Sequence, residues 1–203
     1  MNRYFTTNVL RMFQNRKIYI CTLGMALTLY MSGIAFIRSD GDSANLQDAF
    51  SVVSSSGFII LFYLLCVIGG GLSYCEDCNS GFTRYAVVRG DAKKYIRGHL
   101  FSAALGGCAS MLGGMALYEL LMIFTLWPIK GSFYAMFSQN HAYFIQNIWN
   151  ALLLSLLGAV LAGLAMTVTA CIPNIFVGTA APILILYMVM TLLNKWCSNI
   201  YLL

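Results

Sequence analysis

Charged side chains are rare in this sequence, and their rarity excludes an ordinary soluble domain. Only 9% of the 203 residues are Asp, Glu, Lys or Arg, whereas 60% are hydrophobic and the mean hydropathy is +0.76. Soluble domains carry about 25% charged residues. The sequence therefore predicts an all-α membrane protein in which residues 1–203 form a single transmembrane domain.

Side chains that carry out catalysis are also few. The two histidines, His99 and His141, stand in no His-Glu-x-x-His spacing and have no carboxylate nearby in sequence, so neither a metal site nor a catalytic triad is predicted. We interpret both as interfacial histidines satisfied by water or headgroups. A phosphate loop ending in Gly-Lys-Ser or Gly-Lys-Thr is missing, which excludes nucleotide hydrolysis by such a loop in this chain. The sequence predicts no enzyme, and no metal or cofactor of its own.

Cysteine is present, but a disulfide framework is not. The seven cysteines are an odd number and lie mostly inside apolar runs, unlike the paired cysteines of small secreted proteins. Cys75 and Cys78 form a lone Cys-x-x-Cys pair, without the second pair of a zinc site or the βαβ pattern of a redox centre. Chance or simple packing is the favoured interpretation, and the role of this pair stays open.

The basic residues gather in two segments. Nine of the twelve Lys and Arg side chains lie either before the first apolar run or in residues 75–98. Basic segments beside membrane spans are retained in the cytoplasm, so both segments and the N-terminus are predicted to be cytoplasmic. This distribution accounts for the net charge of +5 without a nucleic-acid partner.

Five apolar runs are long enough to span a membrane, since about 20 apolar residues cross the hydrocarbon core. The predicted spans are residues 18–37, 49–74, 99–127, 147–171 and 175–193. They predict a polytopic helix bundle of five spans. In residues 1–17, Phe5, Val9, Met12 and Phe13 share one helical face between basic and polar residues, which predicts a cytoplasmic amphipathic helix on the membrane surface. A frayed basic tail is the alternative.

Small residues recur within the spans. Gly69-Gly70-Gly71 lies near the end of the second run, where it either lets a neighbouring helix approach closely or is simply tolerated. Small residues four positions apart also predict close helix packing. They are Gly106, Ser110 and Gly114 in the third run, and Ser155, Ala159 and Gly163 in the fourth.

Residues 75–98, which we name the charged segment, hold eight of the 19 charged side chains and lie between the second and third runs. Apolar and aromatic residues alternate with the charges, which favours a docking surface for a soluble partner. A solvated loop without a partner is the alternative. The predicted docking residues are Glu76, Asp77, Gly81, Phe82, Arg84, Tyr85, Arg89, Lys93 and Lys94.

Glu119 is the only acidic residue within a predicted span. A carboxylate at membrane depth usually faces the interior of a bundle or a water-filled path, which makes Glu119 a candidate for a substrate path. It lies close to the outer end of its span, so a carboxylate reaching toward headgroup water is an equally good interpretation.

The charged segment resembles a loop of a known family. Glu76, Gly81 five positions later, a short apolar and basic stretch, Arg89-Gly90 and a basic segment ending in Tyr95 resemble the cytoplasmic loop between spans two and three of ABC-2-type transporter permeases. In that family this loop forms the coupling helix region, which docks on the ATP-binding subunit. The amphipathic helix and the short outer and inner loops are similar as well. The resemblance implies a sixth span, whereas this sequence predicts five.

The resemblance also implies a function: the permease subunit of an ATP-binding cassette transporter in the plasma membrane, exporting an amphipathic or hydrophobic substrate such as a peptide, lipid or drug. The implied partners are a separate ABC ATPase subunit that carries ATP and Mg, a second permease chain in a homodimer or heterodimer, and membrane lipid. The alternatives are a small substrate-binding membrane subunit of a vitamin-type importer and a non-transporting immunity-type membrane protein.

Overall fold

The computed structural model of the chain describes residues 2–40, 58–83, 92–130 and 142–200. These residues form seven helices and contain no strand. In chain order the helices are α1 (Asn2–Gln14), α2 (Arg16–Asp40), α4 (Phe58–Gly70), α5 (Ser73–Asn79), α7 (Ala92–Lys130), α9 (Ala142–Cys171) and α10 (Ile175–Ile200). The predicted all-helical class is confirmed for this part of the chain.

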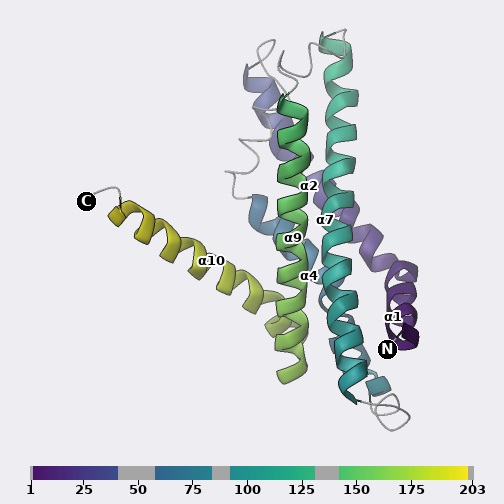
Figure 1. Cartoon of the computed structure of the whole chain (residues 1–203). Helices are drawn as coiled ribbons and strands as arrows, with labels where there is room; N and C mark the ends of the chain where they lie inside the picture. Colours follow the sequence, from purple (N-terminus) through teal and green to yellow (C-terminus); the bar gives the residue numbers. More distant parts are fainter. Residues whose placement is uncertain (1, 41–57, 84–91, 131–141, 201–203) are drawn as a thin grey trace.

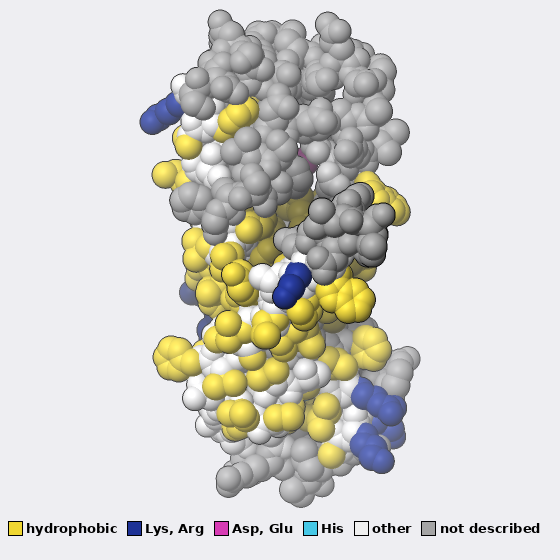
Figure 2. All heavy atoms as spheres, turned by 90° about the vertical axis from the view of Figure 1, so that its left-hand side faces the viewer, with side chains coloured by type: hydrophobic (Ala, Val, Ile, Leu, Met, Phe, Trp, Pro, Cys, Tyr) yellow, Lys and Arg dark blue, Asp and Glu magenta, His cyan; other side chains and the backbone are white. Residues whose placement is uncertain are grey.

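Four of the described helices, α2, α7, α9 and α10, are long and apolar enough to cross a membrane. The bent pair formed by α4 and α5 adds a fifth candidate if it is counted as one span. On the face shown in Figure 2, hydrophobic side chains form a band across the middle, and several basic side chains lie together below it. These features are those of an all-α membrane protein with four to five candidate spans.

The second predicted span is not one continuous helix. Its residues 49–57 lie outside the described part of the chain, and the helix that follows ends at Gly70. After Gly71 and Leu72 the chain turns by 49° into α5. Tyr74 and residues 75–79 therefore belong to a separate short helix, which includes the first residues of the charged segment.

Two glycines at the bend pack closely against neighbouring helices. A methyl group added at Gly70 would lie 2.5 Å from the backbone nitrogen of Gly107 on α7, and one added at Gly71 would lie 2.6 Å from Cβ of Ala165 on α9. Both distances are too short for a side chain. The glycines therefore serve close approach, which was one of the two alternatives left open by the sequence.

A glycine from each of three helices meets at one point, which we name the glycine crossing: Gly70 of α4, Gly107 of α7 and Gly158 of α9. A methyl group added at Gly107 would meet the carbonyl oxygen of Gly158 and lie 2.6 Å from Cβ of Ala162. Cys66 of α4 fills the adjacent space, and its thiol lies 3.5 Å from the carbonyl oxygen of Gly107. Backbone thus approaches backbone here, as small residues allow.

The predicted rows of small residues differ in outcome. Gly106, Ser110 and Gly114 on α7 are all buried, so the prediction for this helix is confirmed. On α9 the prediction is right for buried Ser155 but wrong for Ala159 and Gly163, which are only partly buried. The α9 contact follows Ser155, Gly158, Ala162 and Ala165 instead. A spacing of three and four residues keeps to one helical face, whereas a strict spacing of four drifts away from it.

The two ends of the chain are placed differently in Figure 1: α1 lies beside the lower end of α7, whereas α10 diverges from the other helices. Only 11% of the α10 span is buried, against 33–39% for the other long spans.

The α9–α10 turn is short, and Asn174 caps α10 by accepting a hydrogen bond of 3.0 Å from the Phe176 N–H. Pro182 lies inside α10.

Candidate functional site

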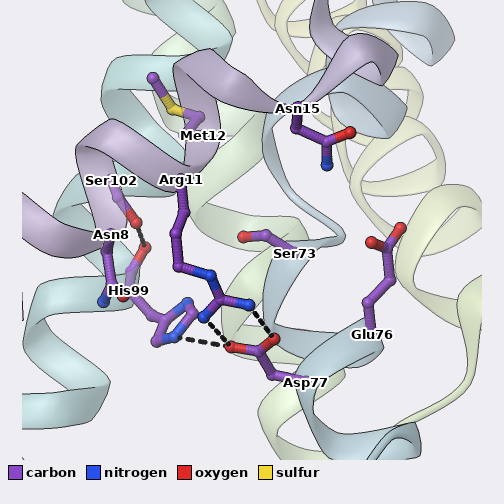
Figure 3. Close-up of a pocket in the computed structure, with 9 residues that line it drawn as sticks. All are labelled: Asn8, Arg11, Met12, Asn15, Ser73, Glu76, Asp77, His99 and Ser102. Atoms are coloured by element: carbon purple, nitrogen blue, oxygen red, sulfur yellow. Dashed lines mark hydrogen bonds and ion pairs between the residues drawn. The ribbon is translucent and has the colours of Figure 1, made fainter.

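Described residues of the charged segment belong to α5 and α7, and α1 lies beside these two helices at one end of the bundle (Figures 1 and 3). The first residues of the segment form α5, and its last residues, from Ala92 onward, are the first turns of α7. The third helix, α1, lies against α7. Asn15 links α1 to α2, and its side-chain oxygen accepts a hydrogen bond of 3.1 Å from the Lys17 N–H in the first turn of α2. Beyond α5 the chain turns at Gly81, whose φ of 75° suits a residue without a side chain.

Asp77 on α5 joins these three helices. Its side chain is buried, and the Arg11 guanidinium of α1 donates two hydrogen bonds to it, of 3.0 and 3.2 Å (Figure 3). The hydroxyl group of Tyr95 on α7 donates a third, of 3.1 Å. A two-bond arginine–carboxylate pair fixes both distance and orientation, so Asp77 holds α1 and α7 in a defined position on α5.

His99 completes what we name the Asp77 cluster, namely Asp77, Arg11, Tyr95 and His99. Its Nε2 lies 3.3 Å from Oδ2 of Asp77, and its ring packs edge-on against Tyr74 and Tyr95. Only 3% of His99 is exposed, so the predicted interfacial position of this histidine is wrong. The other histidine, His141, lies outside the described residues.

The charge of Asp77 is stabilised by its neighbours. Burial raises the pKa of the Asp77 carboxyl group, because a buried charge loses hydration. The neighbouring His99 and Arg11 side chains outweigh this effect and hold the pKa of Asp77 below its usual value. The cluster therefore contains an ionised carboxylate at neutral pH.

Further contacts tie the end of α5 to its surroundings. Lys17 forms an ion pair with Glu76, and both side chains are partly exposed. The Arg11 guanidinium also lies 4.9 Å from the centre of the Phe82 ring, which is a cation–π distance. The hydroxyl groups of Ser80 and Thr83 donate hydrogen bonds of 3.2 and 3.1 Å to the backbone carbonyl oxygen of Asp77.

A polar cavity of about 70 Å³ lies beside the cluster. Its lining residues are Asn8, Arg11, Met12, Asn15, Ser73, Glu76, Asp77, His99 and Ser102 (Figure 3). Asn8 Nδ2 and both His99 ring nitrogens are buried without an aligned hydrogen-bond partner. A cavity of this size and polarity suits ordered water. Among the described residues, no group of His, Cys, Asp and Glu side chains is arranged to hold a metal ion.

The predicted docking residues fall into different environments. Asp77 faces the interior, and Glu76 is paired with Lys17. Gly81 forms the turn after α5, and Phe82 is 45% exposed beneath Arg11. Lys93 and Lys94 are exposed on the first turn of α7. The remaining predicted docking residues, Arg84, Tyr85 and Arg89, lie outside the described residues.

The other candidates from the sequence are placed as follows. Cys75 and Cys78 lie one turn apart on α5; Cys75 is buried, and burial raises the pKa of its thiol. A raised pKa disfavours the reactive thiolate, which agrees with a packing role.

Glu119 is partly buried on α7 beside the buried Tyr118, and its assignment to a substrate path stays a prediction.

Sequence reasoning missed three members of the cluster: Arg11, Tyr95 and His99. The residues that meet are distant in the chain, since Arg11 and Asp77 are 66 positions apart. No local signal in the sequence marked these residues. On α1, Asn8 and Met12 are buried, but the burial of a polar residue follows from tertiary packing and not from a local pattern.

The chain matches no family model, no curated protein and no solved structure.

Proposed function

We propose that this chain is the membrane-spanning permease subunit of an ATP-driven transporter of the ABC-2 type. A separate ATPase subunit binds at the charged segment, and a second permease chain completes the assembly. The proposal extends to export of an amphipathic or hydrophobic substrate across the plasma membrane, with residues 1–17 at the cytoplasmic surface in contact with lipid. The five-span count takes residues 49–74, which include α4, as the second span, and most of α5 belongs to the charged segment on the cytoplasmic side.

The observation that carries this proposal is the continuity of α7. The helix has 39 residues and begins inside the charged segment. At 1.5 Å per residue, 39 residues extend about 58 Å, whereas the hydrocarbon core is about 30 Å thick. A helix of this length reaches well beyond one membrane face. A partner that pushes on its first turns would act on a rigid lever rooted in the bundle.

The second connection to the charged segment differs from α7 because it is bent. Displacement of α5 reaches α4 through the glycines at residues 70–71, which hold a bend of 49°. Nucleotide-driven closure of the ATPase pair would tilt α7 and α4 and change access to a path between two permease chains, with Glu119 as the candidate path residue. Driving such a change requires a difference in partner binding of a few kcal/mol between the two states.

Co-purification with the ATPase subunit tests the proposal. We expect Arg84→Glu and Arg89→Glu together to weaken association of a phosphate-loop ATPase with the full chain at least tenfold, because both substitutions reverse charges in the predicted docking surface. Arg38→Glu is the matched control, since Arg38 is an exposed arginine in the last turn of α2. Unchanged association in the double variant would contradict the docking assignment. Substrate-stimulated ATP hydrolysis by the reconstituted complex is the corresponding test of transport.

A further inference from the structure

We propose that Arg11 is a coupling residue that links the position of α1 to the position of Phe82, so that a displacement of the charged segment is transmitted to α1. The inference rests on the proposed function only for the identity of the partner that displaces the segment. The link itself belongs to this chain and is testable without a partner.

The geometry of Arg11 is the first support. One guanidinium group donates two hydrogen bonds to Asp77 on α5 and lies over the ring of Phe82. Phe82 is 45% exposed, and the predicted docking residues Arg84 and Tyr85 lie two and three positions after it in the sequence. Arg11 therefore stands between a buried anchor and an exposed side chain of the predicted docking surface. Any movement of Phe82 therefore changes the surroundings of the Arg11 guanidinium, which connects α1 to Asp77.

The contrast between two ion pairs is the second support. Arg11–Asp77 and Lys17–Glu76 both connect the N-terminal part of the chain to α5. The carboxylate of the first pair is 8% exposed and that of the second is 37% exposed. Water and salt weaken an exposed pair, whereas a buried carboxylate that loses its partner is left unsatisfied. Of these two ion pairs, the Arg11 contact therefore contributes more to the position of α1.

The remaining contacts of α1 explain why it can respond without leaving the protein. Met12 is buried against α7, where its sulfur atom packs at the position that a side chain on Gly106 would occupy. Apolar packing of this kind is not directional. It keeps α1 near α7 while the polar contact at Arg11 determines the position of its C-terminal half. A change at Phe82 would therefore shift or loosen α1 rather than release it.

Hydrogen exchange of the full chain in lipid nanodiscs tests the first half of the link. We expect Arg11→Gln to raise the exchange rates of α1 amides about tenfold, because hydrogen bonds to a buried charge are lost. Glu76→Gln, which breaks only the exposed pair, should change them less than twofold. If Arg11→Gln fails to fold, Arg11→Lys replaces it, with an expected rise of about threefold, since Lys keeps the charge but not the two-bond geometry. Unchanged exchange in the Arg11 variant would overturn the proposal.

A double-mutant cycle tests the transmission from Phe82. Phe82→Ala should raise α1 exchange about threefold in the natural sequence and cause no further rise in the Arg11→Gln background, because Arg11 carries the effect. Ile96→Ala is the control, since Ile96 is a similarly exposed apolar residue on α7. Additive effects, or an equal response to Ile96→Ala, would overturn the proposal. Because no ATPase is present in this experiment, its outcome is independent of whether the docking assignment holds.

Discussion

The glycine crossing and the Asp77 cluster both join three helices, but by opposite means. At the crossing, α4, α7 and α9 approach so closely that an added methyl group would meet backbone or another Cβ. At the cluster, α1, α5 and α7 are joined by a carboxylate that accepts bonds from Arg11 and Tyr95. The glycine crossing forms because its glycines have no side chains, whereas the Asp77 cluster forms through the charge and orientation of a few long polar side chains.

This difference indicates which part of the protein tolerates movement. Tightly packed backbones allow no adjustment without a clash. Long polar side chains can exchange one partner for another while the helices shift. The crossing is therefore suited to a fixed pivot within the bundle, and the cluster to a contact that changes with the state of the charged segment.

The largest expected effect comes from filling the glycine crossing. Gly107→Leu should prevent folding or lower the free energy of unfolding by about 3 kcal/mol or more, because the new side chain meets Gly158 and Ala162. Thermal unfolding in detergent, followed by tryptophan fluorescence, measures this change. Gly163→Leu is the matched control, since among the described residues a methyl group there comes within 4 Å of Leu100 alone, at 3.8 Å. Equal stability of the two variants would mean that the helices are not in close contact at Gly107.

Neutralising the cluster should have the next largest effect. Asp77→Asn removes the negative charge to which Arg11 and Tyr95 donate hydrogen bonds. We expect it to lower the free energy of unfolding by about 1–3 kcal/mol, the typical contribution of hydrogen bonds to a charged group. Chemical denaturation of the detergent-solubilised protein measures the loss. A full retention of stability would show that the cluster does not hold the three helices together.

The pH dependence of stability distinguishes the cluster from the crossing. Because the pKa of Asp77 is lowered in the folded protein, its charge stabilises the fold above the pKa of an unfolded aspartate, about 3.9. That contribution is lost as the pH falls through the lower folded-state value. We expect the stability difference between the natural chain and Asp77→Asn to shrink as the pH falls below about 4. Gly107→Ala should show no such acid dependence of its stability difference.

The smallest effect is expected at the exposed ion pair. Glu76→Gln should change the free energy of unfolding by less than about 0.5 kcal/mol, since Lys17 and Glu76 are both partly exposed. Raising the salt concentration should reduce even this difference. A loss as large as that of Asp77→Asn would remove the distinction drawn between the two ion pairs.

The glycine crossing was partly predictable, and the cluster was not. The four-residue spacing of Gly106, Ser110 and Gly114 marks the packed face of α7, because helical periodicity is a local property. The partner face on α9 was misjudged, since the contact follows Gly158 and Ala162 instead of Ala159 and Gly163. Asp77 was predicted as part of a docking surface because apolar and aromatic residues alternate with charges in the charged segment. Its burial depends on Arg11 and His99, which no local pattern connects to it.

The amino-acid sequence by itself determined the class of this protein, because long apolar runs with few charges define membrane-spanning helices through local composition alone. It also located the charged segment and the small residues that let α7 pack closely. Only the tertiary structure decided that the chain bends after Gly70, that His99 is buried, and that Arg11 reaches both Asp77 and Phe82. These features depend on contacts between residues far apart in the chain, which come together only when the helices have packed.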